Sequence, residues 1–146
     1  MDFWLELNLK LLEQIIDVSE ALKPGYYRSN NIIRFGKKWV YSEDTNIEYK
    51  LFEIIRSYLF QKYLKNYESV YEFGCGSVHN LYHWSQMGPE KEYFGFDWAD
   101  PVVEIGKKLS KHGRIKTFKY DFYKPTSIKN NFKISSKSCS ITLVSM

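Results

Sequence analysis

The sequence predicts an α/β fold in which about four parallel strands are flanked by helices and preceded by an α-helical N-terminal extension. Two observations lead to this prediction. Beyond residue 66, short apolar runs alternate with segments that have the three- and four-residue spacing of helices. Glycine, proline or aspartate stands at most changes of pattern, where strands end and helices begin. Strands that alternate with helices of this length form right-handed crossovers and a parallel sheet covered on both faces.

The composition fits one domain without a membrane span. Of the 146 residues, 44% are apolar, which is enough for a single core. The formal net charge of +4 comes from 21 basic and 17 acidic residues scattered along the chain, so no dense basic stripe indicates nucleic acid. No apolar run approaches the roughly 18 residues of a membrane span, and no secretory signal opens the chain. We expect a soluble, cytoplasmic protein with two reduced cysteines.

The first part of the chain predicts a helix followed by an extended segment. Polar residues recur every three or four positions from Asp2 to Leu22, opposite an apolar face, which indicates a surface helix that ends at Pro24-Gly25. Two β-prone stretches, residues 31–35 and 38–41, are separated by a glycine. They fit either a short hairpin or an extended arm.

A second helix is predicted from Thr45 to about Asn66. The segment Thr45-Asn46-Ile47-Glu48 has the form of a capping box, in which the threonine hydroxyl accepts a backbone amide of the first turn and Glu48 reaches back to the amide of Thr45. The helix is expected to bury an apolar face formed by Ile47, Leu51, Ile54, Tyr58 and Leu59.

Residues 67–146 are predicted to form the sheet. Strands are expected over residues 70–73, 93–96, 115–122 and 140–146, and helices over residues 77–87 and from Asp100 to the closing Gly113. Gly88-Pro89 ends the first of these helices. Asp100-Pro101 begins the second, because Asp caps backbone amides and Pro fits the first helical position.

The first strand of this sheet runs directly into Gly74-Cys75-Gly76 and then into a helix. Such a turn places bare backbone beside a ligand, with the helix amides directed at it, although tight turns of this kind also occur without a ligand. Three carboxylates favour a ligand: Glu72 precedes the turn, and Asp97 and Asp121 end the next two strands. Ligands of open α/β sheets bind at these carboxyl ends. We expect Glu72 to pair with a cationic amine, Asp97 with ribose hydroxyls and Asp121 with an adenine amino group.

Three motifs then resemble a known family. Tyr71-Glu72-Phe73-Gly74-Cys75-Gly76-Ser77, Gly95-Phe96-Asp97-Trp98 and Tyr120-Asp121-Phe122 are similar, in order and spacing, to the first three cofactor motifs of class I S-adenosylmethionine-dependent methyltransferases. The resemblance covers about residues 69–146 and implies a Rossmann-like methyltransferase sheet with S-adenosyl-L-methionine as the cofactor. The implied cofactor-binding residues are Glu72, Phe73, Gly74, Cys75, Gly76, Asp97, Trp98, Asp121 and Phe122.

Each of these positions has a role implied by the resemblance. Glu72 is the partner of the methionine amino group, and the turn from Gly74 to Gly76 is the backbone floor. Asp97 clamps the ribose with Trp98 beside the adenine, while Asp121 and Phe122 contact the adenine side. The family usually has a third glycine two residues after Gly76, where this chain has Val78. A branched side chain there narrows the approach to the cofactor or weakens its affinity.

The resemblance also implies how the chain is divided. Residues 1–66 would pack on or cap the cofactor site, with Trp39 and Tyr41 as an arm that folds over it. Residues 67–146 would form the cofactor-binding half-domain, incomplete at its C-terminus, because a full domain of the family has seven strands. The fourth strand then leaves an apolar open edge. We therefore expect a truncated chain, completed along that edge by a missing half or by a second copy.

Two other kinds of site are disfavoured. A nicotinamide-binding fingerprint would need glycine where His79 stands, and it does not tolerate an acidic residue aimed at a pyrophosphate from the position of Glu72. His79 and His83 are four residues apart on one helix, but no glutamate follows the first histidine and no third ligand accompanies the pair. We expect no metal.

The expected activity is methyl transfer to an unknown acceptor, which we expect to be a small molecule. Transfer from a sulfonium is an in-line displacement, for which the protein aligns nucleophile and methyl group in a site closed to water. No catalytic base can be assigned, since the family's acceptor-recognition groups lie at the end of the fourth strand or later. The alternative is a non-catalytic or vestigial cofactor-binding module that pairs with another chain through its open sheet edge.

Overall fold

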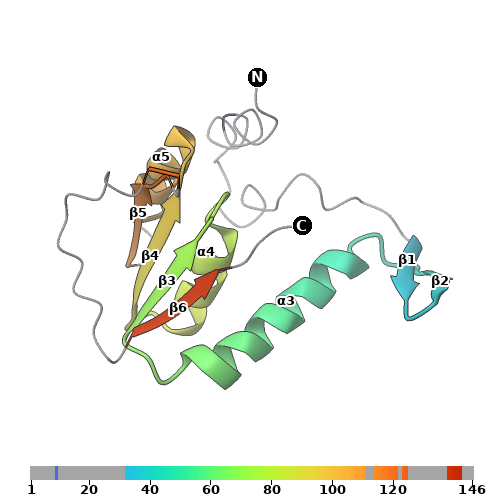
Figure 1. Ribbon diagram of the computed structural model, residues 1–146. Coiled ribbons are helices and arrows are strands. Elements are labelled where there is room, and N and C mark those ends of the chain that lie inside the picture. Colours follow the sequence, from blue (N-terminus) through green and yellow to red (C-terminus); the bar gives the residue numbers. More distant parts are fainter. Residues whose placement is uncertain (1–8, 10–31, 111–113, 122, 125–137, 143–146) are drawn as a thin grey trace.

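The structure, a computed structural model, describes residues 9, 32–110, 114–121, 123–124 and 138–142 (Figure 1). The helix predicted over Asp2–Leu22 lies outside these residues apart from Leu9, which is helical. The elements are β1 (Ile32–Phe35), β2 (Lys38–Tyr41), α3 (Ile47–Leu59), the π-helical turn η1 (Phe60–Leu64), β3 (Ser69–Phe73), α4 (His79–Met87), β4 (Glu92–Asp97), α5 (Asp100–Leu109), β5 (Ile115–Lys119) and β6 (Ser138–Thr142). No helix in the described ranges has the length and apolar character needed to cross a bilayer.

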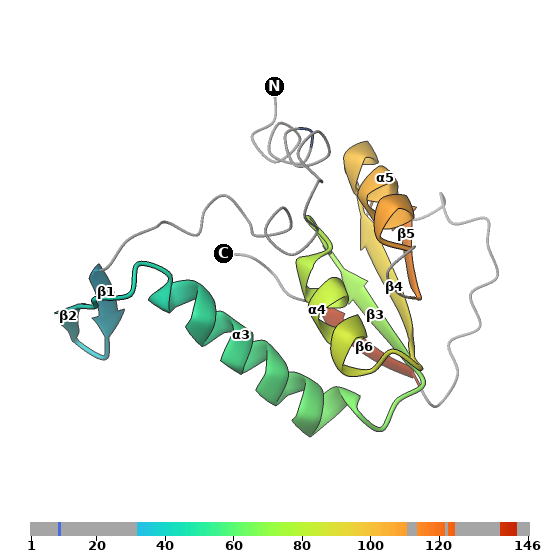
Figure 2. The ribbon, with the colours of Figure 1, turned by 180° about the vertical axis from the view of Figure 1, so that it is seen from behind.

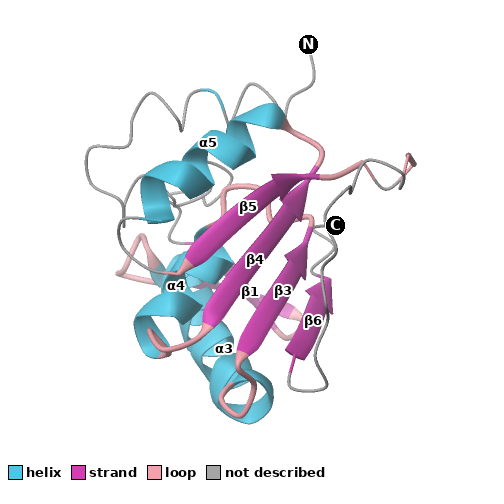
Figure 3. Ribbon diagram, turned by 90° about the vertical axis from the view of Figure 1, so that its left-hand side faces the viewer, coloured by secondary structure: helices cyan, strands magenta, loops and turns pink. Residues whose placement is uncertain are grey.

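The main sheet has the strand order β5-β4-β3-β6, and every neighbouring pair is parallel (Figure 3). The predicted α/β fold with a parallel sheet is confirmed. The strand predicted over residues 140–146 begins two residues earlier, at Ser138, and its last four residues lie outside the described part of the chain. Because the strands are parallel, their carboxyl ends meet at one edge of this sheet, where the candidate residues lie at or just after the ends of β3, β4 and β5.

In the described residues, both helices of the sheet cover the same face. Val70, Tyr93 and Ile115 are register partners on three neighbouring strands, and all three are fully or almost fully buried against α4 and α5. The chain steps from β3 to β4 to β5 in one direction, and successive right-handed crossovers in one direction place their helices on one side. The expectation of a sheet covered by helices on both faces is therefore not met in this part of the chain.

The opposite face of the sheet is aromatic. The ring of Tyr71 stacks on that of Phe94 with centroids 4.8 Å apart, and Phe73 stacks on Phe96 at 5.0 Å. Phe118 of β5 continues the row, 5.5 Å from Phe96. Offset aromatic pairs at these distances add roughly 0.5–1.5 kcal/mol each beyond the area that they bury. This row stiffens the three strands whose ends carry the candidate site.

The segment before the sheet is a hairpin and a long helix. The antiparallel pair β1 and β2 confirms the hairpin, which lies at the outer end of α3, away from the sheet (Figures 1 and 2). Trp39 and Tyr41, predicted as an arm over the cofactor, belong to this hairpin and are 73% and 71% exposed. The C-terminal end of α3 runs into η1, where Phe60 and Leu64 are buried in the core.

Two details predicted for α3 are wrong. The helix begins at Ile47, and no side chain caps it; Asp44 instead accepts the backbone N–H of Asn46 at 2.8 Å, so an aspartate turn replaces the capping box. The predicted apolar face is also not buried, since Leu51, Ile54 and Tyr58 are exposed. The buried residue of the helix is Arg56, because α3 turns polar groups toward α4.

The start of α5 is close to the prediction but differs in its cap. The helix begins at Asp100 with Pro101 in its first turn, as expected. The residue before it, Ala99, occupies the capping position without a side-chain bond. Asp100 pairs instead with Lys119 of β5 at 2.6 Å. The N–H of Ala99 is bonded to Asp97, so the residue that ends β4 also orders the entry into α5.

Candidate functional site

The glycine turn is bonded to the end of the neighbouring strand. The backbone N–H groups of Gly74 and Cys75 both donate to the carbonyl of Phe96, at 2.8 and 3.2 Å. Gly74 and Gly76 have φ angles of 77° and 49°, a left-handed conformation that glycine adopts without strain. The turn therefore leaves β3 sharply and crosses in front of the carboxyl end of β4.

Asp97 fixes this turn through both of its carboxylate oxygens. Oδ2 accepts the backbone N–H of Gly76 at 2.9 Å, and Oδ1 accepts that of Ala99 at 3.1 Å. The side chain is 7% exposed. A carboxylate has about four acceptor positions, of which these bonds use two, so Asp97 retains capacity for hydroxyl donors. The structure thus brings together Asp97 and the glycine turn, two features that the sequence placed 21 residues apart.

Glu72 is the most buried carboxylate of the site, at 1% exposed. Its Oε1 accepts a hydrogen bond of 2.7 Å from the Asn80 amide, whereas Oε2 has no hydrogen-bond partner in the described part of the chain. Burial raises the pKa of Glu72 to about 8, and the charge of Asp97 adds to the rise, while the bond from Asn80 and the charge of Arg56 oppose it. A buried carboxylate oxygen without a hydrogen-bond partner, such as Glu72 Oε2, is suited to a cationic partner.

A polar layer between α3 and α4, which was not predicted from the sequence, supports Glu72. The Arg56 guanidinium Nε donates to Asn80 Oδ1 at 2.6 Å, so Arg56, Asn80 and Glu72 form a continuous chain of hydrogen bonds. The indole Nε1 of Trp84 donates to the carbonyl of Arg56 at 3.2 Å. The only signal in the sequence was a charged residue amid apolar neighbours on the second helix, Arg56 after Ile54-Ile55.

His79 belongs to the same layer. Its Nε2 is 2.9 Å from the Tyr49 hydroxyl, and Nδ1 has no hydrogen-bond partner among the residues that the structure describes. Burial lowers the pKa of His79 to about 3, and the charges of Arg56 and His83 act in the same direction. His79 is therefore a buried neutral group at the start of α4.

The remaining candidate residues lie around the same edge. Trp98 directly follows Asp97 and is 43% exposed. The carbonyl of Asp97 accepts the N–H of Tyr120 at 2.6 Å, which brings the segment after β5 beside the end of β4. Asp121 accepts the N–H of Tyr123 at 2.9 Å within a turn. Phe122 lies outside the described residues.

Two candidates lie on opposite sides of the turn's backbone. The Phe73 ring stacks on Phe96 and so belongs to the aromatic face of the sheet. Cys75 is 6% exposed and packs in the core with Leu81. Burial raises the pKa of the Cys75 thiol well above its ordinary value, and the charges of Glu72 and Asp97 act in the same direction. For both residues, only the backbone is available to a ligand on the open side of the turn.

The absence of a side chain at Gly95 leaves space for Cys75, so we expect Gly95→Ala to destabilise the turn. A Cβ atom at residue 95 would lie 2.7 Å from Cys75 Sγ and 2.9 Å from Leu81 Cδ1. Overpacking of this kind costs roughly 1–3 kcal/mol. Urea unfolding should show that loss when Gly95→Ala is made in the wild type. The same substitution should cost less when it is made in a Cys75→Ala background, because the nearest contact, Cys75 Sγ, is absent there. Strictly additive losses in the double variant would contradict this account.

Val78 is strained, and we expect Val78→Gly to be nearly neutral. Its φ is 63°, an outlier for a β-branched residue that costs roughly 1–3 kcal/mol, yet its side chain is fully buried. Replacement by glycine removes a buried side chain, which destabilises the fold, and relieves the backbone strain, which stabilises it. The two effects therefore offset each other. The control is Val70→Gly in β3, which is equally buried without positive φ and should cost roughly 3–4 kcal/mol. Equal losses in urea unfolding would show that Val78 is unstrained.

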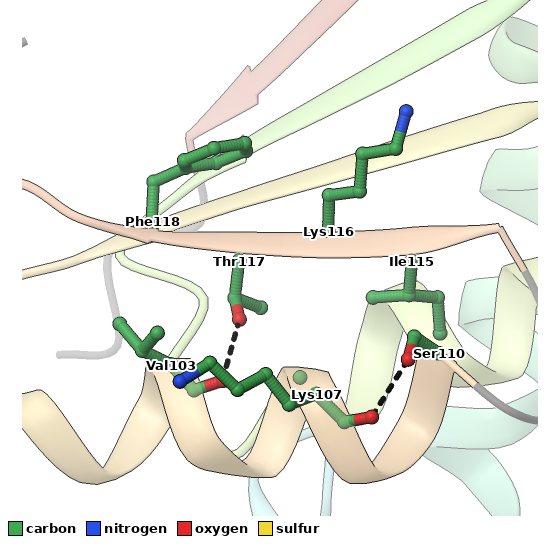
Figure 4. Close-up of a pocket in the computed structure, with 8 residues that line it drawn as sticks. Val103, Lys107, Ser110, Ile115, Lys116, Thr117 and Phe118 are labelled. Carbon is green, nitrogen blue, oxygen red and sulfur yellow. Dashed lines mark hydrogen bonds between the residues drawn. The ribbon is translucent and has the colours of Figure 1, made fainter. Parts of the chain in front are cut away.

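A separate pocket lies between α5 and β5 (Figure 4). It is open and mostly apolar, with a volume of about 340 Å³, and the Thr117 hydroxyl bonds across it to the carbonyl of Val103 at 3.2 Å. Its lining residues come from α5, β5 and the residue after α5, and none of the predicted cofactor-binding residues is among them. The candidate site is therefore defined by the polar groups at the carboxyl edge.

The comparisons with known proteins give a distant structural similarity. No protein-family profile matches the sequence, and no curated protein matches it either. One similar solved structure is that of the plantazolicin methyltransferase BpumL in complex with SAH, with a TM-score of 0.44 and 16% sequence identity. The similarity covers 91% of this chain and 45% of that chain, so this chain spans less than half the length of that protein. A similarity this distant assigns neither an activity nor a ligand.

Proposed function

We propose that this chain binds S-adenosylmethionine beside the turn Gly74–Gly76 and forms the cofactor-binding part of a methyltransferase with a Rossmann-like sheet. The observation that carries the proposal is Glu72 Oε2, a buried carboxylate oxygen without a hydrogen-bond partner in the described residues. A buried acceptor without a partner costs free energy that a ligand with an ammonium group recovers. The α-amino group of S-adenosylmethionine is such a group.

The other groups of the edge fit the rest of this ligand. Asp97 is held in place by two backbone N–H groups and retains acceptor positions for the two hydroxyls of a ribose. Trp98 offers a half-exposed aromatic ring next to Asp97, where an adenine would stack. Asp121, after β5, is the acceptor proposed for the adenine amino group.

The bound cofactor would supply an activated methyl group for in-line displacement. The residues described here bind and orient the ligand: Glu72 holds one end, Asp97 the ribose, and the glycine turn keeps the backbone close. The methyl acceptor is proposed to be a small molecule. Among the described residues we assign no base to it.

Binding is tested by calorimetry with S-adenosylmethionine and S-adenosylhomocysteine, which share the amino-acid and ribose groups, and with NAD as the competing ligand class. We expect heat with the first two compounds and a roughly tenfold to hundredfold loss of affinity in Glu72→Gln, since a hydrogen bond to a charged group contributes about 1.5–3 kcal/mol. Glu92→Gln, which alters a half-buried glutamate paired with Lys116, should bind normally. A folded protein that gives no heat with either compound would sink the proposal.

A second candidate function is a non-catalytic or vestigial cofactor-binding module that pairs with another chain. The observation in its favour is the edge of β6: in the described residues it pairs with β3 on one side and with no strand on the other. Such an edge presents N–H and C=O groups to a partner strand, from a second copy or from a further part of a longer polypeptide. Sedimentation over a range of concentrations tests self-pairing; concentration-dependent dimers favour it, and a monomer at every concentration counts against it.

A further inference from the structure

Arg56 is buried where an amphipathic helix would bury an apolar residue. It is 8% exposed, while its neighbours Ile54 and Ile55 are 65% and 50% exposed. Removing a guanidinium from water is costly, and the cost is recovered only when hydrogen-bonding partners and opposite charges surround it. The side of α3 that faces α4 therefore has a role other than apolar packing.

The hydrogen bonds of Arg56 fix the orientation of Asn80. A guanidinium only donates hydrogen bonds, so the Asn80 atom that it contacts at 2.6 Å must be the carbonyl oxygen. The amide nitrogen then points the other way, and it donates to Glu72 Oε1 at 2.7 Å. This order occupies one oxygen of the carboxylate and leaves the other to a ligand. The indole of Trp84, bonded to the Arg56 carbonyl, fixes the helix backbone at the same point.

We infer that Arg56 and Asn80 are positioning residues for the ammonium group of the ligand: they hold Glu72 by Oε1, keep Oε2 available and balance the negative charge of the site. The inference rests on the proposed function, since it concerns the same carboxylate. Among the described residues, Asn80 from α4 bonds to Glu72, and Arg56 from α3, Asp97 from β4 and Cys75 from the turn interact with it electrostatically. His79 is the residue before Asn80 on α4. Of these, Arg56 is the cation and Asp97 the second anion, because burial keeps His79 neutral and the Cys75 thiol protonated.

The charge balance explains why Arg56 matters to binding. With a ligand ammonium in place, the two carboxylates of the protein face two cations, Arg56 and the ammonium. Without Arg56, the ammonium alone would face two carboxylates, and Glu72 would hold its proton to a higher pH in the free protein. An ammonium binds the ionised carboxylate, so ligand affinity would then rise only at higher pH. A loss of packing would instead weaken binding equally at every pH.

The test compares the wild type with Arg56→Gln by calorimetry with S-adenosylhomocysteine between pH 6 and 9. Affinity should rise with pH as Glu72 ionises, and we expect this rise to occur about one pH unit higher in Arg56→Gln than in the wild type. The variant should therefore bind roughly tenfold more weakly at pH 7 and largely recover near pH 9. Arg56→Lys, which keeps the charge, should lie close to the wild type in pH midpoint. Lys62→Gln, an exposed cation beyond α3, should change nothing. A pH-independent loss in Arg56→Gln would overturn the inference.

A second measurement does not depend on the ligand. The carboxyl carbon of Glu72, assigned by its disappearance in Glu72→Gln, is titrated by NMR in the wild type, in Arg56→Gln and in Asn80→Leu. Both variants remove an interaction that favours the ionised carboxylate, so both midpoints should move up. Unmoved midpoints would overturn the inference even if the ligand binds. Absence of ligand binding in the wild type would reject the proposed function, whereas the titration would still decide whether Arg56 and Asn80 control Glu72.

Discussion

Asp97→Ala is expected to lower the free energy of unfolding by about 4 kcal/mol and to abolish ligand binding. The substitution leaves two backbone N–H groups, those of Gly76 and Ala99, without their acceptor, and each such loss costs roughly 1–3 kcal/mol. Because the same carboxylate fixes the glycine turn and is proposed to hold the ribose, stability and binding should fall together. Urea unfolding and calorimetry measure the two effects.

Two further variants distinguish a specific role of the Asp97 carboxylate from a general sensitivity of this region to substitution. Asp97→Asn keeps one carbonyl oxygen and should cost about half as much, since one of the two N–H groups retains an acceptor. Asp100→Ala removes a neighbouring aspartate whose side chain is 77% exposed and paired with Lys119, and it should cost less than about 1 kcal/mol. If Asp97→Ala were no more costly than Asp100→Ala, the proposed role of Asp97 in the turn would be wrong.

Glu72 is expected to make the ligand-free protein less stable as the pH rises from about 4.5 to about 8. The unfolded chain releases this proton near the ordinary value of 4.5, whereas burial of Glu72 raises its pKa to about 8 in the folded protein. Between these values the folded state holds a proton that the unfolded state has lost, so each pH unit favours unfolding by roughly 1.4 kcal/mol.

His79 acts in the opposite direction over a lower range. Its pKa is lowered from 6.5 to about 3, so the unfolded chain takes up a proton below pH 6.5 that the folded protein refuses. This group makes stability fall as the pH drops from 6.5 to 3, and it offsets Glu72 between 4.5 and 6.5. From these two groups together, stability is highest between pH 4.5 and 6.5 and declines above 6.5.

The decline above pH 6.5 is the part that identifies Glu72. Urea unfolding at intervals from pH 6.5 to 8.5 should show it in the wild type and not in Glu72→Gln, which has no proton to lose. His79→Gln should instead flatten the acid side and leave the alkaline decline in place. A decline of equal size in the wild type and Glu72→Gln would show that other groups cause it.

The turn and its carboxylates were predictable because their signals are local. A strand that runs into Gly74-Cys75-Gly76 can only turn sharply there, and parallel strands bring residues that follow them to a common edge. Asp97 was therefore expected beside the turn, and the structure places it in hydrogen-bond contact with Gly76. What the pattern could not reveal is that Asp97 orders the turn itself as well as facing the ligand side.

The polar layer of Arg56 and Asn80 was not predictable because it joins residues that no local rule connects. Arg56 and Asn80 are 24 residues apart, on two helices whose contact depends on how α3 packs. Helical periodicity assigned the apolar residues of α3 to the core, but burial of Arg56 reverses that assignment. The capping box failed for a similar reason: Asp44 lies close enough to bond the backbone first, and propensity rules do not rank such competitors.

Hydrogen exchange at the indole N–H of Trp84 reports on the contact between α3 and α4. Trp84 is fully buried, and its only exchangeable side-chain proton is bonded to the carbonyl of Arg56 on α3. That proton can exchange with solvent only when α3 lifts from α4 or when the whole domain unfolds. Its exchange rate therefore gauges the docking of α3 at a single atom. If exchange slows when the ligand binds, the helix and the ligand stabilise each other.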